Sequence, residues 1–180
     1  MRRRTLAGAV AAIATATIAV SAGIAAGSDG SHRHDDHLAE VRDASARYRK
    51  VERAIDDGYT QFFGCIHEPL AGSMGVHFVN GALAGDTVIE AGAPEALMYD
   101  VLPSGKLALL GVEYVLFQEA WDAEHAEPPT LFGETFNLVA EPNRYGIPAF
   151  YELHAWAWKE NPTGAHHDWN PQVLCTTPDR

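Results

Sequence analysis

The segment Lys106–Phe117 has the sequence KLALLGVEYVLF. Side chains alternate between the two faces of a strand, and here both faces are almost entirely apolar. A strand of this kind is typical of the centre of a sheet that is covered on both sides. Glu113 is the exception, because it is a carboxylate in an otherwise apolar run. The segment therefore predicts a central strand that carries one buried acidic group.

Patterns with a period of two continue on either side of this segment. They predict further strands at residues 73–80, 95–102, 131–139 and 150–158. Pro103-Ser104-Gly105 is a good hairpin turn between two of them. Residues 118–129 are acidic and rich in turn residues, so we expect a loop there.

Residues 36–57 have the period of a helix instead. The apolar residues on its predicted buried stripe recur at spacings of three, four and seven: Leu38, Val41, Tyr48, Val51, Ile55 and Tyr59. Asp35 or Asp36 is suited to cap this helix, and Gly58 to end it. The fold class predicted is α+β, with an N-terminal amphipathic helix packed on a bent antiparallel sheet or partial β-barrel.

The N-terminus predicts export. Three arginines at positions 2–4 precede an uncharged stretch of small and apolar residues to position 26, which is typical of a secretory signal peptide. We expect a signal peptide over residues 1–26, a polar His/Asp-rich linker over 27–35 and a single α+β domain over 36–180. After cleavage we expect no stable association with a membrane. The alternative is an uncleaved anchor, since the stretch is about as long as a membrane span, but its alanine, threonine and glycine content favours cleavage.

The mature chain would be strongly acidic. Loss of the three arginines leaves 10 basic and 24 acidic residues, a formal charge of −14. Such a surface repels nucleic acid, and it attracts cations or basic partners. Nucleic acid is therefore not an expected partner, whereas a metal ion or a small molecule is.

Two cysteines, Cys65 and Cys175, are present in the whole chain. In an exported protein they predict one disulfide, which would tie the end of the first helical region to the C-terminus. The alternative is a pair of thiolate metal ligands, but neither cysteine has the short spacing that zinc sites usually show.

Four ionisable residues occupy positions expected to face inward: His77, Glu113, Glu152 and His154. Two imidazoles and a carboxylate are the ligands of many zinc and non-haem iron sites. We therefore predict His77, Glu113 and His154 as ligands of a divalent ion; zinc, iron and copper are not distinguished. Glu152 would orient a histidine or act as a general base. The alternative is that these groups satisfy one another in a purely structural network.

The tail adds His166, His167 and Asp168 close to Cys175. Held by the disulfide, this segment could fold over the open end of the sheet as a lid and supply a further ligand. The alternative is an exposed loop. Trp156, Trp158 and Trp169 could line an apolar ligand pocket or belong to the core.

Several of these segments together resemble a family of small exported bacterial proteins of uncharacterised function. The resemblance extends from about Ala46 to Cys175 and is carried by MGVHFVN at 74–80, GVEY at 111–114, YELHAWAWKENP at 151–162, DWNP at 168–171 and Cys175. It implies export and a single domain, and it supplies no activity or ligand residue.

The sequence thus favours an exported domain that binds a divalent metal ion, and whether it is an enzyme is left open. There is no G-x-S-x-G elbow, phosphate-binding glycine loop or dinucleotide fingerprint. One alternative is a non-catalytic binding module for a small organic ligand. Another is a structural envelope protein whose polar groups pair internally.

Overall fold

The computed structural model describes residues 29–175, with side chains described from His37 onward. The predicted signal peptide lies outside the described residues. The backbone is helical from Asp29, so helix extends through most of the segment expected as a linker.

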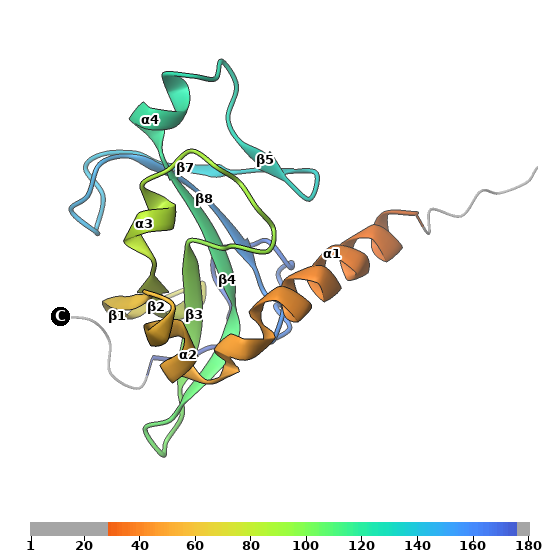
Figure 1. The fold of residues 1–180 in the computed structure, drawn as a ribbon. Coiled ribbons are helices and arrows are strands. Elements are labelled where there is room, and N and C mark those ends of the chain that lie inside the picture. The colour runs from red at the N-terminus through yellow and green to blue at the C-terminus, as the bar shows by residue number, and fades with distance from the viewer. Residues whose placement is uncertain (1–28, 176–180) are drawn as a thin grey trace, which may run out of the picture.

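The molecule is built on one curled antiparallel sheet (Figure 1). Its strand order is β1-β2-β3-β4-β8-β7. The strands are β1 (Thr60–Glu68), β2 (Gly72–Val79), β3 (Ala96–Val101), β4 (Leu107–Phe117), β8 (Phe150–Ala155) and β7 (Asn137–Val139). The prediction of helices combined with a bent antiparallel sheet is confirmed, and β4 lies inside the sheet between β3 and β8, as expected.

The connections contain short elements. The expected strand at 131–139 is divided into β7 and a separate two-stranded ribbon of β5 (Thr130–Leu131) and β6 (Glu134–Thr135). Two short helices are α3 (Gly81–Ala84), which Asn80 caps through its side chain, and α4 (Gln118–Asp122), which occupies the start of the expected loop. The hairpin turn before β4 is present, with the Gly105 amide donating to the Leu102 carbonyl at 2.8 Å.

Three segments replace the single helix expected over residues 36–57. They are α1 (Asp29–Ser45), the 3₁₀ helix η1 (Ala46–Arg49) and α2 (Val51–Asp56). The Ser45 hydroxyl donates to the Val41 carbonyl at 2.6 Å and accepts a 2.9 Å hydrogen bond from the Trp158 indole. Serine bonded back to a carbonyl four residues earlier often bends a helix, and the contact with Trp158 fixes the break against the sheet.

The two faces of the sheet have different roles. Register pairing places Val76, Tyr99, Leu109 and Tyr114 with the main hydrophobic core, into which Val41 of α1 and Ala54 of α2 also pack. The opposite face carries His77, Met98, Glu113 and His154. The α1–α2 region thus covers one face, and the polar residues lie on the other.

The C-terminal segment covers this polar face. Beyond Ala155 the chain leaves the sheet, because the Leu110 carbonyl accepts the amides of both Trp158 and Lys159 at 3.0 Å; the strand expected to run to residue 158 therefore ends early. Farther on, Asn170 forms an isolated antiparallel bridge with Ser73 of β2. The predicted disulfide between Cys65 and Cys175 is confirmed, but Cys65 lies on strand β1 and not at the end of a helical region.

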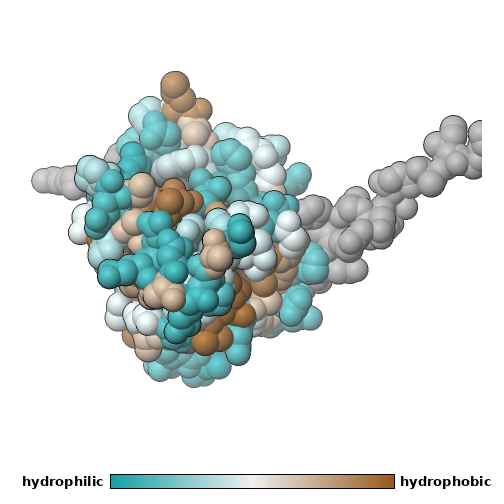
Figure 2. All heavy atoms as spheres, turned by 90° about the horizontal axis from the view of Figure 1, so that it is seen from above, coloured by the Kyte–Doolittle hydropathy of each residue, from teal (hydrophilic) through white to brown (hydrophobic). Residues whose placement is uncertain are grey.

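The outer surface is mixed in character. Seen from above, hydrophobic residues form small groups among hydrophilic ones (Figure 2). Within residues 29–175, no helix has the length and apolar content needed to cross a membrane.

Glu95, which precedes β3, makes folding stability depend on pH. It is 2% exposed, its carboxylate accepts the Val115 amide at 3.0 Å, and burial raises its pKa to about 7. The folded state therefore holds this proton more tightly than the unfolded state, so the free energy of unfolding should fall as pH rises from 4.5 to about 7. The expected loss is about 3 kcal/mol.

Denaturant titrations across this pH range should show that Glu95→Gln removes this fall in the free energy of unfolding with pH. Glutamine stays neutral and can still accept a hydrogen bond from the Val115 amide. Glu90→Gln, at a nearby exposed position, is the matched control. Equal pH slopes for wild type and Glu95→Gln would contradict the assignment.

Candidate functional site

The four predicted inward residues lie on one face of the sheet. In the β4–β8 ladder Glu113 is paired with His154 and Val115 with Glu152, so His154 and Glu152 share the face of Glu113. His77 on β2 reaches this face through its pairing with Met98 of β3. All four side chains are buried, with between 0 and 6% of their area exposed.

His77 and Glu113 meet across an intervening strand. In a flat sheet, directly opposite positions on β2 and β4 would lie roughly 9–10 Å apart, which is two strand spacings. His77 is offset from such a position by two residues, because the residue of β2 in the row of Glu113 is Val79. The residue of β3 opposite Glu113 is Ala96, whose small side chain leaves room above it. This gap and the curl of the sheet let the two side chains approach each other over β3.

The two imidazoles contact the two oxygens of one carboxylate. His77 Nε2 lies 3.3 Å from Glu113 Oε2, and His154 Nε2 lies 4.0 Å from Glu113 Oε1. The two rings are nearly perpendicular, with their centroids 6.3 Å apart. The three residues predicted as metal ligands are therefore brought together at one buried point.

The charges of these groups are strongly interdependent. Burial alone would raise the pKa of Glu113, but His154 and His77 outweigh it and hold the pKa at about 2. Burial alone would lower the pKa of His154, but Glu113 and Asp168 raise it to about 9. Without a metal ion, the centre is thus an ionised carboxylate against a protonated imidazole.

Glu152 lies next to Glu113 on this face. Its side chain is hydrogen-bonded to Glu113, and burial together with the Glu113 charge raises its pKa well above the usual range. A neutral Glu152 can donate a proton to the ionised Glu113 in this hydrogen bond. Its position fits the supporting role expected for it.

Of the three tail residues considered as a lid, Asp168 reaches the centre. Its Oδ1 lies 3.5 Å from His154 Nδ1, on the side of the ring away from Glu113. Asn137 of β7 donates to the same carboxylate oxygen at 2.9 Å. Sequence reasoning missed Asn137, because a single asparagine in a short edge strand gives no signal.

The other two tail residues lie outside the centre. His166 Nδ1 is 2.6 Å from the His154 carbonyl, and its ring stacks on Phe132. The His167 side chain is exposed and contacts Trp169. The tail thus covers the site through its backbone and Asp168, and neither histidine belongs to the groups suited to a metal ion among the described residues.

Two overlapping groups of described residues could hold a metal ion. They are His77, Glu113 and His154, and Glu152, His154 and Asp168; within each group, one donor atom per residue lies within 4.8 Å of the others. His154 belongs to both, with Nε2 toward Glu113 and Nδ1 toward Asp168.

A pocket of about 290 Å³ adjoins the first group, and both His77 and Glu113 line it. Its aromatic wall consists of phenylalanines and a tyrosine. None of the three tryptophans considered for this role lines this pocket. Trp156 and Trp158 line a different cavity; the Trp156 indole donates to the His167 carbonyl, and Trp158 packs against the core beside Ser45. The ring of Trp169 lies under the Arg144 guanidinium.

These features define a class of site: a buried two-histidine, one-carboxylate group on the face of a curled antiparallel sheet opposite the α1–α2 region, which could hold a metal ion. Comparison of the chain with protein-family models, curated proteins and solved structures gives no match. The chemistry of the site is therefore inferred from its geometry.

Proposed function

We propose that this protein is exported and binds a divalent metal ion through His77, Glu113 and His154. Zinc, iron and copper all accept this ligand set. Glu152 and Asp168 support the ligands from outside.

The observation that carries this proposal is the spacing of the donor atoms. A hydrogen bond between a charged nitrogen and a carboxylate is about 2.7–2.9 Å long, whereas the two imidazole–carboxylate distances are 3.3 and 4.0 Å. Two ligands bound tetrahedrally at about 2.0–2.1 Å from one ion lie about 3.3 Å apart. The observed nitrogen–oxygen distances are closer to the separation between two ligand atoms of one ion than to the length of a hydrogen bond.

An unpaired nitrogen atom supports the same interpretation. His154 Nε2, one of the proposed ligand atoms, is buried and has no hydrogen-bond partner among the described residues. His154 Nδ1, which lies 3.5 Å from Asp168, and His77 Nδ1 are buried without such a partner as well. Buried polar atoms are nearly always satisfied, and an ion is one of the standard explanations for an exception. A purely internal polar network would be expected to leave fewer such atoms.

Asp168 has the position of an outer-shell carboxylate. Histidines that bind metals usually donate their second ring nitrogen to a carboxylate, which fixes the tautomer and the ring orientation. Asp168 faces His154 Nδ1 in this way and is itself held by Asn137. This arrangement favours His77, Glu113 and His154 as the ligands over the second group, which would use Asp168 directly.

Export is supported by the disulfide. Disulfide bonds persist in oxidising compartments and are rare in the cytosol of most organisms. The Cys65–Cys175 bond agrees with this, as does the signal-like N-terminal sequence.

Elemental analysis of protein purified from its native export compartment tests the proposal. We expect about one equivalent of a divalent ion in wild type and a loss of most of it in His77→Ala and His154→Ala, since each removes a ligand. His67→Ala is the matched control, because His67 is exposed on β1 outside the site. A fully stable wild-type protein that contains no metal and binds none of added zinc, iron(II) or copper(II) would support the structural alternative instead.

A further inference from the structure

The pocket next to the proposed metal centre is mainly apolar. Among the residues that line it, His77 and Glu113 bear an imidazole and a carboxylate, and Thr60 and Tyr145 bear hydroxyl groups. Pockets that bind small molecules combine an apolar wall with a few convergent polar groups. The pocket has this composition, and the two ionisable groups His77 and Glu113 are both proposed metal ligands.

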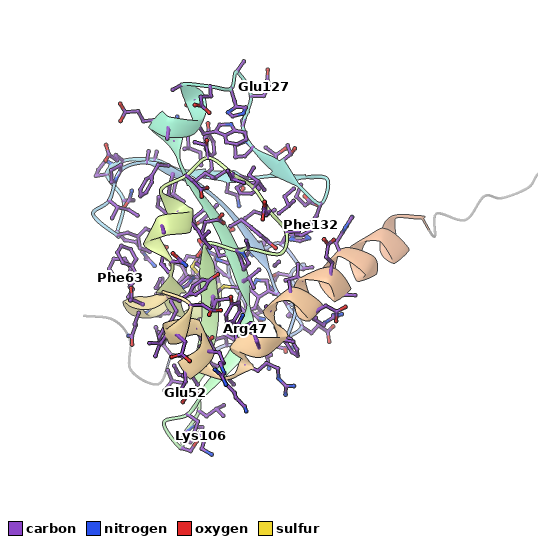
Figure 3. The ribbon with its side chains drawn as sticks, viewed as in Figure 1. Arg47, Glu52, Phe63, Lys106, Glu127 and Phe132 are labelled. Atoms are coloured by element: carbon purple, nitrogen blue, oxygen red, sulfur yellow. A yellow bond between two sulfur atoms is a disulfide. The ribbon has the colours of Figure 1, made fainter. Side chains whose placement is uncertain are left out.

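Four aromatic rings form one wall of this pocket. Phe62 contacts Phe63 with centroids 4.6 Å apart, Phe63 contacts Tyr145 at 5.4 Å, and Tyr145 contacts Phe150 at 5.8 Å. Figure 3 places Phe63 on the β1 side of the molecule, well away from α1. Phe62 is 49% exposed and Phe150 is 4% exposed, so the wall leads from the surface into the interior.

The inner end of the pocket is formed by two of the proposed metal ligands. His77 is 4% exposed and Glu113 is 6% exposed, and His77 Nε2 faces Glu113. Because both residues line the pocket, an ion bound between them would lie at its inner end.

The charge at this end favours an anionic ligand. Glu113 is the one carboxylate among the three proposed metal ligands, so a divalent ion keeps one positive charge within this ligand set. Glu152 and Asp168 are not among the residues that line the pocket, and Asp168 lies beyond His154, where it lines a different cavity. The carboxylate of a ligand in the pocket can bind such an ion through one of its oxygens. The volume, about 290 Å³, lies at the lower end of the range for small-molecule sites and suits one ring or a short branched chain.

We propose that the pocket binds a small apolar monocarboxylate, whose body lies along the Phe62–Phe150 wall and whose carboxylate binds the metal ion held by His77, Glu113 and His154. This inference rests on the proposed metal site. It adds the class of ligand and the direction from which the ligand reaches the ion.

Visible absorption of the full chain loaded with cobalt(II), with benzoate as the probe, tests both parts separately. Ligand-field bands without benzoate report the metal site, and their change on addition of benzoate reports coordination by the carboxylate. We expect saturable binding of benzoate, and binding of benzyl alcohol at least about tenfold weaker, because the alcohol keeps the ring but lacks the charge.

Val79→Phe, which adds bulk within the pocket lining, should weaken benzoate binding at least about tenfold and leave the cobalt bands in place. The same substitution at Val88, which is 53% exposed and outside the pocket lining, is the control. Phe62→Ser at the exposed end of the wall is a milder second variant and should weaken binding several-fold. Phe62→Ser tests the pocket if the Val79→Phe variant does not fold.

Three results would overturn this inference: cobalt bands that benzoate leaves unchanged, equal affinity for benzyl alcohol, or undiminished benzoate binding in both pocket variants. In each of these cases the metal site itself would stand. Absence of cobalt bands in wild type would instead refute the metal site, and the ligand inference with it.

Discussion

Glu113→Gln is expected to abolish the stabilisation of the protein by a divalent ion. A ligand that binds the folded state alone raises the free energy of unfolding, by about 4 kcal/mol when present at 1,000 times its dissociation constant. Glutamine keeps the shape of the side chain but lacks the negative charge with which the Glu113 carboxylate binds the ion. Thermal unfolding with and without excess zinc should therefore show a large shift for wild type and almost none for the variant.

The same substitution should also destabilise the metal-free protein. Glu113 is the charge that most raises the pKa of His154, which is completely buried. Removing one partner of a buried ion pair typically costs about 3–5 kcal/mol. Glu127→Gln, at an exposed position in the segment that follows α4 (Figure 3), is the matched control and should behave as wild type in both measurements. A zinc-dependent shift that survives in Glu113→Gln would exclude Glu113 as a ligand.

Loss of the disulfide should have the second large effect. The bond closes a loop with a sequence separation of 110 residues. In the chain-entropy model a loop of this length contributes about 4.7 kcal/mol, and removal of native disulfides typically costs about 2–5 kcal/mol. Equilibrium denaturation of Cys65→Ser/Cys175→Ser should therefore show a loss of several kcal/mol compared with oxidised wild type.

This double variant should weaken metal binding as well. The bond holds the end of the segment that carries Asp168, and Cys175 lies next to Ser73 of β2. Release of this end would let Asp168 leave His154, and loss of an outer-shell partner costs about 10–100-fold in metal affinity. Reduced wild-type protein is the matched control and should show the same two losses. Unchanged stability and affinity in both samples would show that the tail is held by other contacts.

The sequence predicted the central part of the fold because its strands follow simple physical rules. Alternation placed Glu113, His154 and Glu152 on one face once their strands were neighbours, and β4 and β8 do pair. The approach of His77 to Glu113 depends on the curl of the sheet and on Ala96 in the strand between. A one-dimensional pattern does not contain these two features, so the site was predictable in composition and not in geometry.

Strand β1 was not predicted, for a specific reason. Its pairing with β2 shifts register twice, between Gln61 and Cys65 and between Ile66 and His67. Each irregularity interrupts the period of two on which strand prediction depends. The same strand supplies Phe62 and Phe63, so the aromatic wall of the pocket could not be found from the sequence.

In the helical region, the sequence predicts the local structure but not the position at which the helix breaks. The apolar spacing over residues 36–57 is that of a helix, and each part of it is helical, but the break at Ser45 depends on Trp158, which lies 113 residues away. Likewise, the strand that begins at Phe150 ends at Ala155 because amides farther along the chain bond to Leu110. In both cases a long-range contact overrides a local preference.

Anomalous diffraction from crystals of the exported protein grown with zinc would locate the bound ion. We expect one strong peak about 2.0–2.2 Å from His77 Nε2, His154 Nε2 and a Glu113 oxygen. No peak at this point, or a peak on the other side of His154 between Glu152 and Asp168, would contradict this expectation.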